Sequence, residues 1–144
     1  MATFVSQLKS SASPAHSPAR EGLISGGVRA LLRLEGFAAF AGALAFYAHH
    51  GFSWAIFALL FLTPDASMLA YLAGPRTGAI IYNVAHIYAA PVTLALMGFA
   101  AGVPAVMAGG LIWIAHIGFD RALGYGLKYP TGFGDTHLGR IGRR

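Results

Sequence analysis

Cysteine is absent from this 144-residue sequence, and charged residues are scarce. Without cysteine the chain has no disulfide framework, no thiolate metal site and no cysteine nucleophile. Charged residues make up 10% of the chain and hydrophobic residues 56%, whereas a soluble domain carries about a quarter charged residues. This composition excludes an ordinary soluble domain and places the chain among membrane proteins.

The formal net charge of +5 does not indicate a nucleic-acid-binding protein. Such proteins gather lysine and arginine on a solvated face. Here the basic residues flank apolar stretches instead, which is the pattern of membrane topology. We therefore expect the chain to lie in a lipid bilayer and to bind no nucleic acid.

Four apolar stretches are each close to the ~20 residues that cross a hydrocarbon core as a helix. They cover residues 28–48, 52–72, 78–101 and 103–125. The connections between them are short, and short connections make consecutive helices antiparallel. The sequence thus predicts an all-α fold, an integral-membrane four-helix up-down bundle over residues 28–125.

The two ends of the chain have a different composition from the bundle. Residues 1–27 are rich in Ser, Ala, Pro and Gly and lack the continuous apolar core of a secretory signal peptide, so we predict a disordered cytoplasmic tail. Residues 126–144 combine glycines and Pro130 with the aromatic residues Tyr129 and Phe133. We predict an interfacial segment and a basic tail there, with no long helix.

The basic residues predict the orientation of the bundle. They precede or open the first stretch, separate the second from the third, and follow the fourth. They are Lys9, Arg20, Arg29, Arg33, Arg76, Arg121, Lys128, Arg140, Arg143 and Arg144. All of them fall on one side, which the positive-inside rule makes cytoplasmic. We expect a multi-pass protein of the inner membrane with both termini in the cytoplasm.

Each apolar stretch carries at least one polar or ionisable side chain at a similar depth. These side chains are Glu35 in the first stretch, Asp65 in the second, Tyr82 and His86 in the third, and His116 and Asp120 in the fourth. Residues four apart share a helix face. A carboxylate in hydrocarbon costs at least a few kcal/mol unless it is paired, protonated or hydrated. We therefore expect these side chains to face one another inside the bundle.

Histidines and carboxylates together are typical of a divalent metal site, and imidazole suits Zn or Fe. The predicted metal ligands are Asp65, His86, His116 and Asp120, and the predicted proton-handling residues are Glu35 and Tyr82. Such a site with an open position would activate a bound water.

The same residues also have a structural interpretation. The histidines are equally consistent with neutral, hydrogen-bonded side chains of the core. Asp65 could cap the helix that resumes after Pro64, because aspartate accepts backbone donors at a helix start. Asp120 could pair with Arg121. The sequence leaves the two interpretations open.

Three runs of residues resemble a bacterial membrane family, domain of unknown function 4260 (DUF4260). They are Leu-Thr-Pro-Asp-Ala-Ser-Met at 62–68, Tyr-Asn-Val-Ala-His at 82–86, and His-Ile-Gly-Phe-Asp-Arg at 116–121 with Gly-Tyr-Gly-Leu-Lys-Tyr at 124–129. The resemblance implies a four-helix membrane protein and implies no activity. A weaker similarity, in residue types alone, is to membrane-bound metal-dependent hydrolases.

Three functions follow as hypotheses. The first is a metal-dependent membrane enzyme, a hydrolase or oxidoreductase acting on a lipid-like substrate. The second is a non-catalytic accessory subunit that packs against a membrane-protein partner or a second copy of itself, as faces rich in glycine and alanine favour. The third is a proton or small-ion pathway, since chains of Asp, Glu and His recur in such relays.

Overall fold

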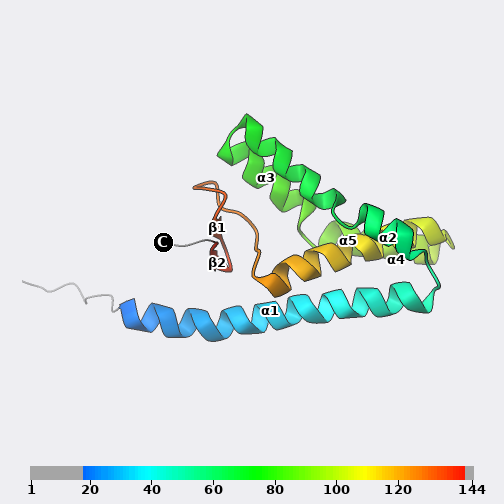
Figure 1. Cartoon of the computed structure of the whole chain (residues 1–144), viewed down its shortest axis with the longest axis horizontal. Helices are drawn as coiled ribbons and strands as arrows, with labels where there is room; N and C mark the ends of the chain where they lie inside the picture. The colour runs from blue at the N-terminus through cyan, green and yellow to red at the C-terminus, as the bar shows by residue number, and fades with distance from the viewer. Residues whose placement is uncertain (1–17, 142–144) are drawn as a thin grey trace, which may run out of the picture.

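The computed structural model describes residues 18–141, which fold into helices followed by a short β-hairpin (Figure 1). The elements are α1 (Pro18–His49), α2 (Trp54–Leu60), the 3₁₀-helix η1 (Thr63–Ala73), α3 (Pro75–Ala85), α4 (Ala89–Ala100), α5 (Pro104–Leu123), β1 (Asp135–Thr136) and β2 (Gly139–Arg140). The all-α prediction is confirmed.

Within residues 18–141, four helical segments are long and apolar enough to cross a membrane. They are Gly26–His49, Trp54–Ala73, Pro75–Ala100 and Pro104–Leu123. Both ends of each segment lie within a few residues of the ends of a predicted stretch. In Figure 1 the chain runs back and forth along these segments, as the antiparallel order predicts. We call them the first to the fourth span.

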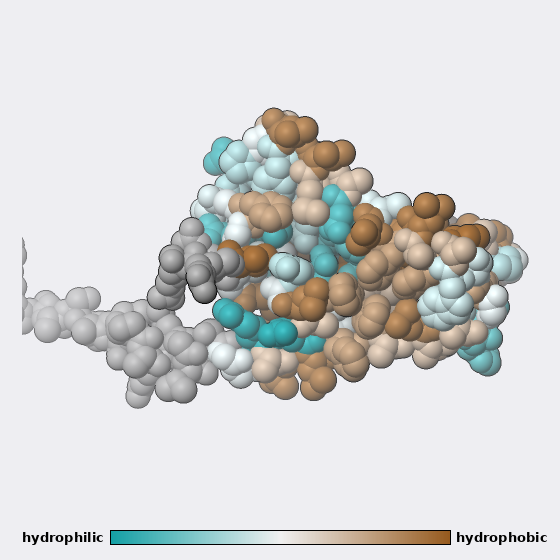
Figure 2. All heavy atoms as spheres, viewed as in Figure 1, coloured by the Kyte–Doolittle hydropathy of each residue, from teal (hydrophilic) through white to brown (hydrophobic). Residues whose placement is uncertain are grey.

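Large apolar side chains point outward on all four spans. The exposed fraction is 62% for Leu34, 89% for Leu72, 67% for Phe99 and 51% for Leu123. Figure 2 shows hydrophobic residues spread over much of the helical surface. An apolar surface of this extent is unfavourable in water but matches lipid tails. The four apolar helices therefore indicate a membrane protein in a lipid bilayer.

Helix α5 is the central element, because it packs along both α1 and α4. Glycines permit these close approaches. A Cβ atom added at Gly118 would lie 2.6 Å from the backbone nitrogen of Phe40 on α1, and one at Gly110 would lie 2.5 Å from that of Ala95 on α4. Small residues at helix contacts are the usual way in which membrane helices approach closely.

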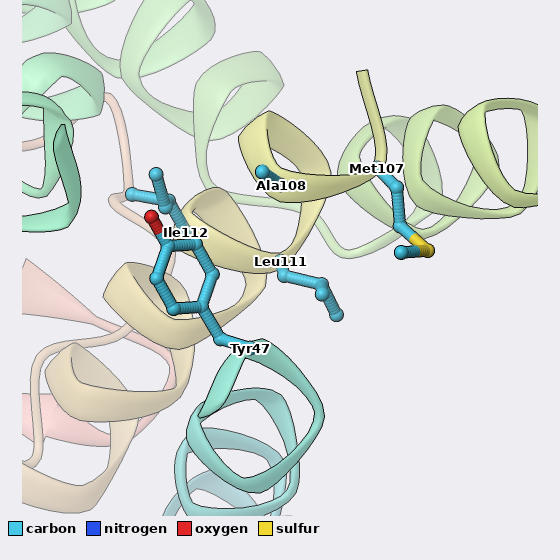
Figure 3. Close-up of a cluster of buried hydrophobic side chains, with 5 residues drawn as sticks. All are labelled: Tyr47, Met107, Ala108, Leu111 and Ile112. Atoms are coloured by element: carbon cyan, nitrogen blue, oxygen red, sulfur yellow. The ribbon is translucent and has the colours of Figure 1, made fainter. Parts of the chain in front are cut away.

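A buried apolar cluster joins the end of α1 to the first half of α5. It contains Tyr47, Met107, Ala108, Leu111 and Ile112 (Figure 3). The Tyr47 hydroxyl donates to the backbone carbonyl of Ser53 at 2.7 Å, so this buried ring keeps its polar atom satisfied. The cluster holds the connection between α1 and α2 against α5.

The second span is divided into α2 and η1 at a proline. Pro64 has no N–H to donate, so the carbonyl of Leu60, four residues earlier, loses its usual helical partner. The Thr63 hydroxyl donates to that carbonyl instead, at 2.6 Å. The freed backbone group is thus satisfied within the protein, as a hydrocarbon environment requires. Asp65 comes directly after this break.

The third span is divided at His86, where α3 ends and the backbone leaves helical geometry before α4 begins. Side chains of α5 supply donors to the carbonyls around the break. The indole N–H of Trp113 donates to Ala85 at 2.7 Å, and the Arg121 guanidinium donates to His86 at 3.4 Å. Pro91 is fully buried in the first turns of α4. Both breaks therefore lie beside residues of the predicted site.

Helix α1 begins at Pro18 rather than at residue 28, so the predicted disordered tail of residues 1–27 overlaps it. Proline suits the first turn of a helix, because the N–H that it lacks would have no partner there. The remainder of that predicted tail, residues 1–17, lies outside the described residues, as do residues 142–144.

Candidate metal centre

Helix α5 supplies two residues of the site from its last turns. His116 and Asp120 are four apart, so they share one helix face. The His116 ring is 1% exposed. Gly124, with a φ of 98°, ends the helix one turn later, and the N–H of Tyr125 donates to the carbonyl of Asp120 at 2.8 Å. This glycine cap turns the chain back toward the site.

The two interrupted spans supply the other residues. His86 is the residue at which α3 ends, and it is 3% exposed. Asp65 lies in the first turn of η1, directly after Pro64. Interrupted membrane helices recur at ion and substrate sites, because the break brings polar groups to a depth where a continuous helix presents none.

The four side chains meet at one point. One ligand atom from each of Asp65, His86, His116 and Asp120 lies within 4.8 Å of all the others. The Nε2 atoms of the two histidines are 3.2 Å apart, and each lies between 3.5 and 3.8 Å from an oxygen of Asp65 and of Asp120. We call these four residues the His/Asp group.

A backbone contact fixes the ring of His86. Its Nδ1 atom lies 2.8 Å from the carbonyl oxygen of Tyr82, which only accepts hydrogen bonds, so Nδ1 carries the proton. In the neutral ring Nε2 is then unprotonated and directs its lone pair at the other members of the group. Metal-binding histidines are commonly held by a contact of this kind.

Tyr82 adds a hydroxyl and an aromatic face to the site. It is 3% exposed, and its ring stacks on that of His86 with the centroids 3.7 Å apart. Its hydroxyl donates to Oδ2 of Asp120 at 3.2 Å. This contact orients the carboxylate and leaves the hydroxyl beside the four ligand atoms.

The geometry of the His/Asp group fits a small divalent ion. Ligands about 2.0–2.2 Å from a tetrahedral Zn²⁺ lie roughly 3.3–3.6 Å from one another. The distances of 3.2 to 3.8 Å between the histidine nitrogens and their neighbours match this spacing. The donor set of two imidazoles and two carboxylates suits Zn²⁺ or Fe²⁺.

A family model described as "Domain of unknown function (DUF4260)" matches residues 29–141. The chain belongs to the DUF4260 family. The matched region contains the whole His/Asp group and Tyr82. A search of the curated proteins and a search of the solved structures each found no match.

A pocket of about 230 Å³ opens onto the carboxylate side of the group. It is lined by Asp65, Met68, Tyr82, Asp120, Tyr125, Lys128 and Phe133. Neither histidine lines it. The two histidines therefore lie on the buried side of the group, and the two carboxylates face the pocket. We call this space the site pocket. The group is therefore open to the site pocket on its carboxylate side.

The sequence marks Lys128 as a basic residue that orients the bundle and as part of the DUF4260 run, and not as a site residue, yet the fold buries it beside the group, at 4% exposed. Its backbone is held by Asn83 on α3, which donates to the Lys128 carbonyl at 2.9 Å and accepts from the Lys128 N–H at 2.7 Å. Burial lowers the pKa of the Lys128 amine, against the opposing effect of the nearby Asp120 and Asp65 carboxylates. No periodic signal in this glycine-rich segment points to that burial.

The structure does not bring every predicted site residue to the His/Asp group. Glu35 is exposed on α1 and is not a member of the group. A further histidine, His137, was not among the predicted site residues and is also not a member of the group; it follows β1, where its Nδ1 accepts from the Leu127 N–H at 2.8 Å. Burial and the charge of Arg121 lower the pKa of His137.

Proposed function

We propose that the His/Asp group binds one divalent transition metal, Zn²⁺ or Fe²⁺, and that this DUF4260 protein is a metal-dependent membrane enzyme. The convergence of four ligand atoms from three different spans within 4.8 Å carries the proposal. Two carboxylates brought so close repel each other, and a cation bound between them would remove this repulsion and lower the cost of their charges in an apolar environment. The orientation of His86 by the Tyr82 carbonyl supports the same reading.

The residues of the site divide into holding and reacting roles under this proposal. His86 and His116 hold the ion from the closed side. Asp65, with 29% of its side chain exposed, is the ligand best placed to make room for water or substrate. A divalent ion makes a bound water more acidic and polarises a substrate oxygen. The Tyr82 hydroxyl is the group placed to pass a proton, while a proton-handling role for Glu35 requires it to act from outside the group.

The substrate of such an enzyme would be lipid-like. The site pocket lies between η1, α3 and the segment after α5, and the lining elements also carry side chains that face the lipid. Leu69 and Leu72 on η1 are 68% and 89% exposed. An alkyl chain could therefore stay in the bilayer while its polar end enters the pocket.

Elemental analysis tests the metal part of the proposal. Wild-type protein, H116A and the control H49A would be purified without chelators and then loaded with Zn²⁺ or Fe²⁺. His49 is an exposed residue at the end of α1 and is not a member of the His/Asp group, so H49A should keep the metal. We expect about one ion per chain in the wild type and H49A and a large loss in H116A. Equal metal content in all three proteins, or none in the wild type, would refute the metal site.

Untargeted lipid analysis tests the enzyme part. Wild type and H116A would each be incubated with a membrane lipid extract, with and without a chelator, and the products compared by mass spectrometry. The expected result is a product that requires both His116 and the metal. Identical lipid profiles for metal-loaded wild type and H116A would contradict an enzyme acting on these lipids.

A proton pathway is the second candidate. Its support is the unbroken series of titratable side chains from Asp65 through His86 and His116 to Asp120, with neighbouring atoms 3.2 to 3.8 Å apart. Such series carry protons in membrane proteins. Proton flux into liposomes that is present in the wild type and lost in D65N would favour this function over the enzyme.

We also infer that both ends of the chain face the cytoplasm of the inner membrane. The start of α1, the connection between η1 and α3, and the segment after α5 lie toward one end of the molecule in Figure 1. Arg29 and Arg33 lie in the first half of α1, Arg76 lies at the start of α3, and Lys128 follows α5. The positive-inside rule makes that end cytoplasmic.

A further inference from the structure

Lys128 is a buried cation that lies over two aromatic rings. Its ammonium group lies 4.0 Å from the ring centroid of Phe133 and 5.1 Å from that of Tyr82. Among the described residues, no carboxylate oxygen forms an ion pair with it within 4 Å. Aromatic faces stabilise a cation only in part, and buried charges are normally paired.

The charge balance of the site changes when an ion binds. Asp65 and Asp120 carry two negative charges, and in the empty group Lys128 balances one of them. A divalent ion held between neutral histidines and both carboxylates balances their two charges by itself. Lys128 then remains as a positive charge on the wall of the site pocket with nothing to balance it. An anionic group in the pocket would restore the balance and lie against both cations.

The outer part of the pocket is apolar. Met68, Tyr125 and Phe133 line it, and the two aromatic rings are 42% and 48% exposed. Such rings accept an amphiphile at the boundary between lipid and water, because their faces contact the alkyl part while the polar part stays hydrated. A small inorganic anion alone would leave these contacts unused.

We propose that the site pocket binds an amphiphile by an oxyanion head group, a phosphate ester or a carboxylate, and that Lys128 holds its charge. This inference rests on the proposed metal site and names the substrate class for it. Lys128 acts as a binding residue here, because its backbone is fixed by Asn83 and its ammonium group faces the pocket that opens on Asp65 and Asp120.

Phosphorus NMR tests this inference with a defined probe. Wild type, K128M, K128Q, K128R and the control R76M would be loaded with paramagnetic Co²⁺ in maltoside micelles, and the relaxation of dodecyl phosphate measured. Arg76 is an exposed cation at the start of α3 and does not line the pocket. Inorganic phosphate is the second probe, and laurate serves as a competing carboxylate.

We expect the phosphorus nucleus of dodecyl phosphate to relax faster when the probe is bound to Co²⁺-loaded wild type or R76M than when it is free. Its affinity should be roughly tenfold or more lower for K128M and K128Q, and K128R should keep part of the affinity. Cobalt content shows that a variant is folded at the site, since Lys128 is not a metal ligand. Competition by laurate would extend the class to carboxylates.

The outcomes separate this inference from the proposed function. Equal binding of dodecyl phosphate to Co²⁺-loaded wild type and K128M would overturn the role of Lys128 and leave the metal site intact. Tighter binding of inorganic phosphate than of dodecyl phosphate would overturn the amphiphile and identify a free-phosphate site. Failure of the wild type to hold Co²⁺ would overturn the proposed metal function, and a metal-free titration of dodecyl phosphate would then test Lys128 by itself.

Discussion

At the scale of single residues, the ring of His86 is held before any ion arrives. Its Nδ1 proton is bound by the Tyr82 carbonyl at 2.8 Å, and its face rests on the Tyr82 ring. Because both contacts come from one residue a helical turn away, the end of α3 orients its own ligand. Such outer contacts favour binding, since less freedom is lost when the ion enters.

Removing the Tyr82 hydroxyl should weaken metal binding without abolishing it. Y82F keeps the stacked ring but loses the donor to Asp120. Loss of a contact to a metal ligand typically costs 10–100-fold in affinity, so we expect a decrease of about that size in competition with a chromophoric chelator. The control is Y88F, because the Tyr88 hydroxyl is buried with no hydrogen-bond partner among the described residues. Equal affinities for the two variants would contradict the role given to Tyr82.

The convergence of the His/Asp group could be predicted from the sequence, whereas Lys128 could not. Counting residues along an apolar helix gives the depth of Asp65, His86, His116 and Asp120, and the cost of a buried charge predicts that they face inward. Lys128 lies beyond the last span, where no helix period relates its position to the site. Its burial depends on two contacts to Asn83 that link segments far apart in the chain.

At the scale of elements, hydropathy predicts the spans, whereas their interruptions have only local signals in the sequence. Hydropathy measures whether a segment suits lipid, and an interrupted helix suits it as well as a continuous one when its freed carbonyls are satisfied. Pro64 and Pro91 are the local signals in the second and third spans. The satisfying donors from Thr63, Trp113 and Arg121 become visible only in three dimensions.

The crossing of α1 and α5 should be sensitive to a single methyl group. In G118A the new Cβ would meet the backbone of Phe40 on α1, and backbone atoms have no side-chain rotation by which to give way. We expect a loss of about 1–3 kcal/mol in the free energy of unfolding, measured in detergent. In the control G109A the added Cβ has nothing within 4 Å, so stability should be unchanged or slightly higher. Equal stability of the two variants would show that the helices do not cross as described.

At the scale of the whole molecule, the C-terminal segment lies against both α1 and α3. It contacts α3 through Asn83 and Lys128, and a pocket between residues 136–139 and α1 is lined by Arg29. In Figure 1 this segment lies between α1 and the pair formed by η1 and α3. The sequence predicts a non-helical segment there but not its fold over the site, because glycine-rich stretches carry no periodicity.

The inferred orientation predicts the behaviour of reporter fusions. Alkaline phosphatase, which is active outside the cytoplasm, should be active when fused after Gly51 or Gly102, in the connections that carry no lysine or arginine. Green fluorescent protein fused to the C-terminus should fluoresce, as it does in the cytoplasm. The reverse pattern would show the opposite topology, with the site pocket on the other side of the membrane.

The most direct test of the central claim is X-ray absorption spectroscopy of the Zn²⁺-loaded protein, since it reports the atoms around the ion. The geometry of the His/Asp group predicts nitrogen and oxygen ligands at about 2.0–2.2 Å, with the outer scattering of two imidazole rings and no sulfur. H116A should lose the scattering of one ring. A spectrum without imidazole scattering, or one unchanged by H116A, would contradict a metal centre built from His86 and His116.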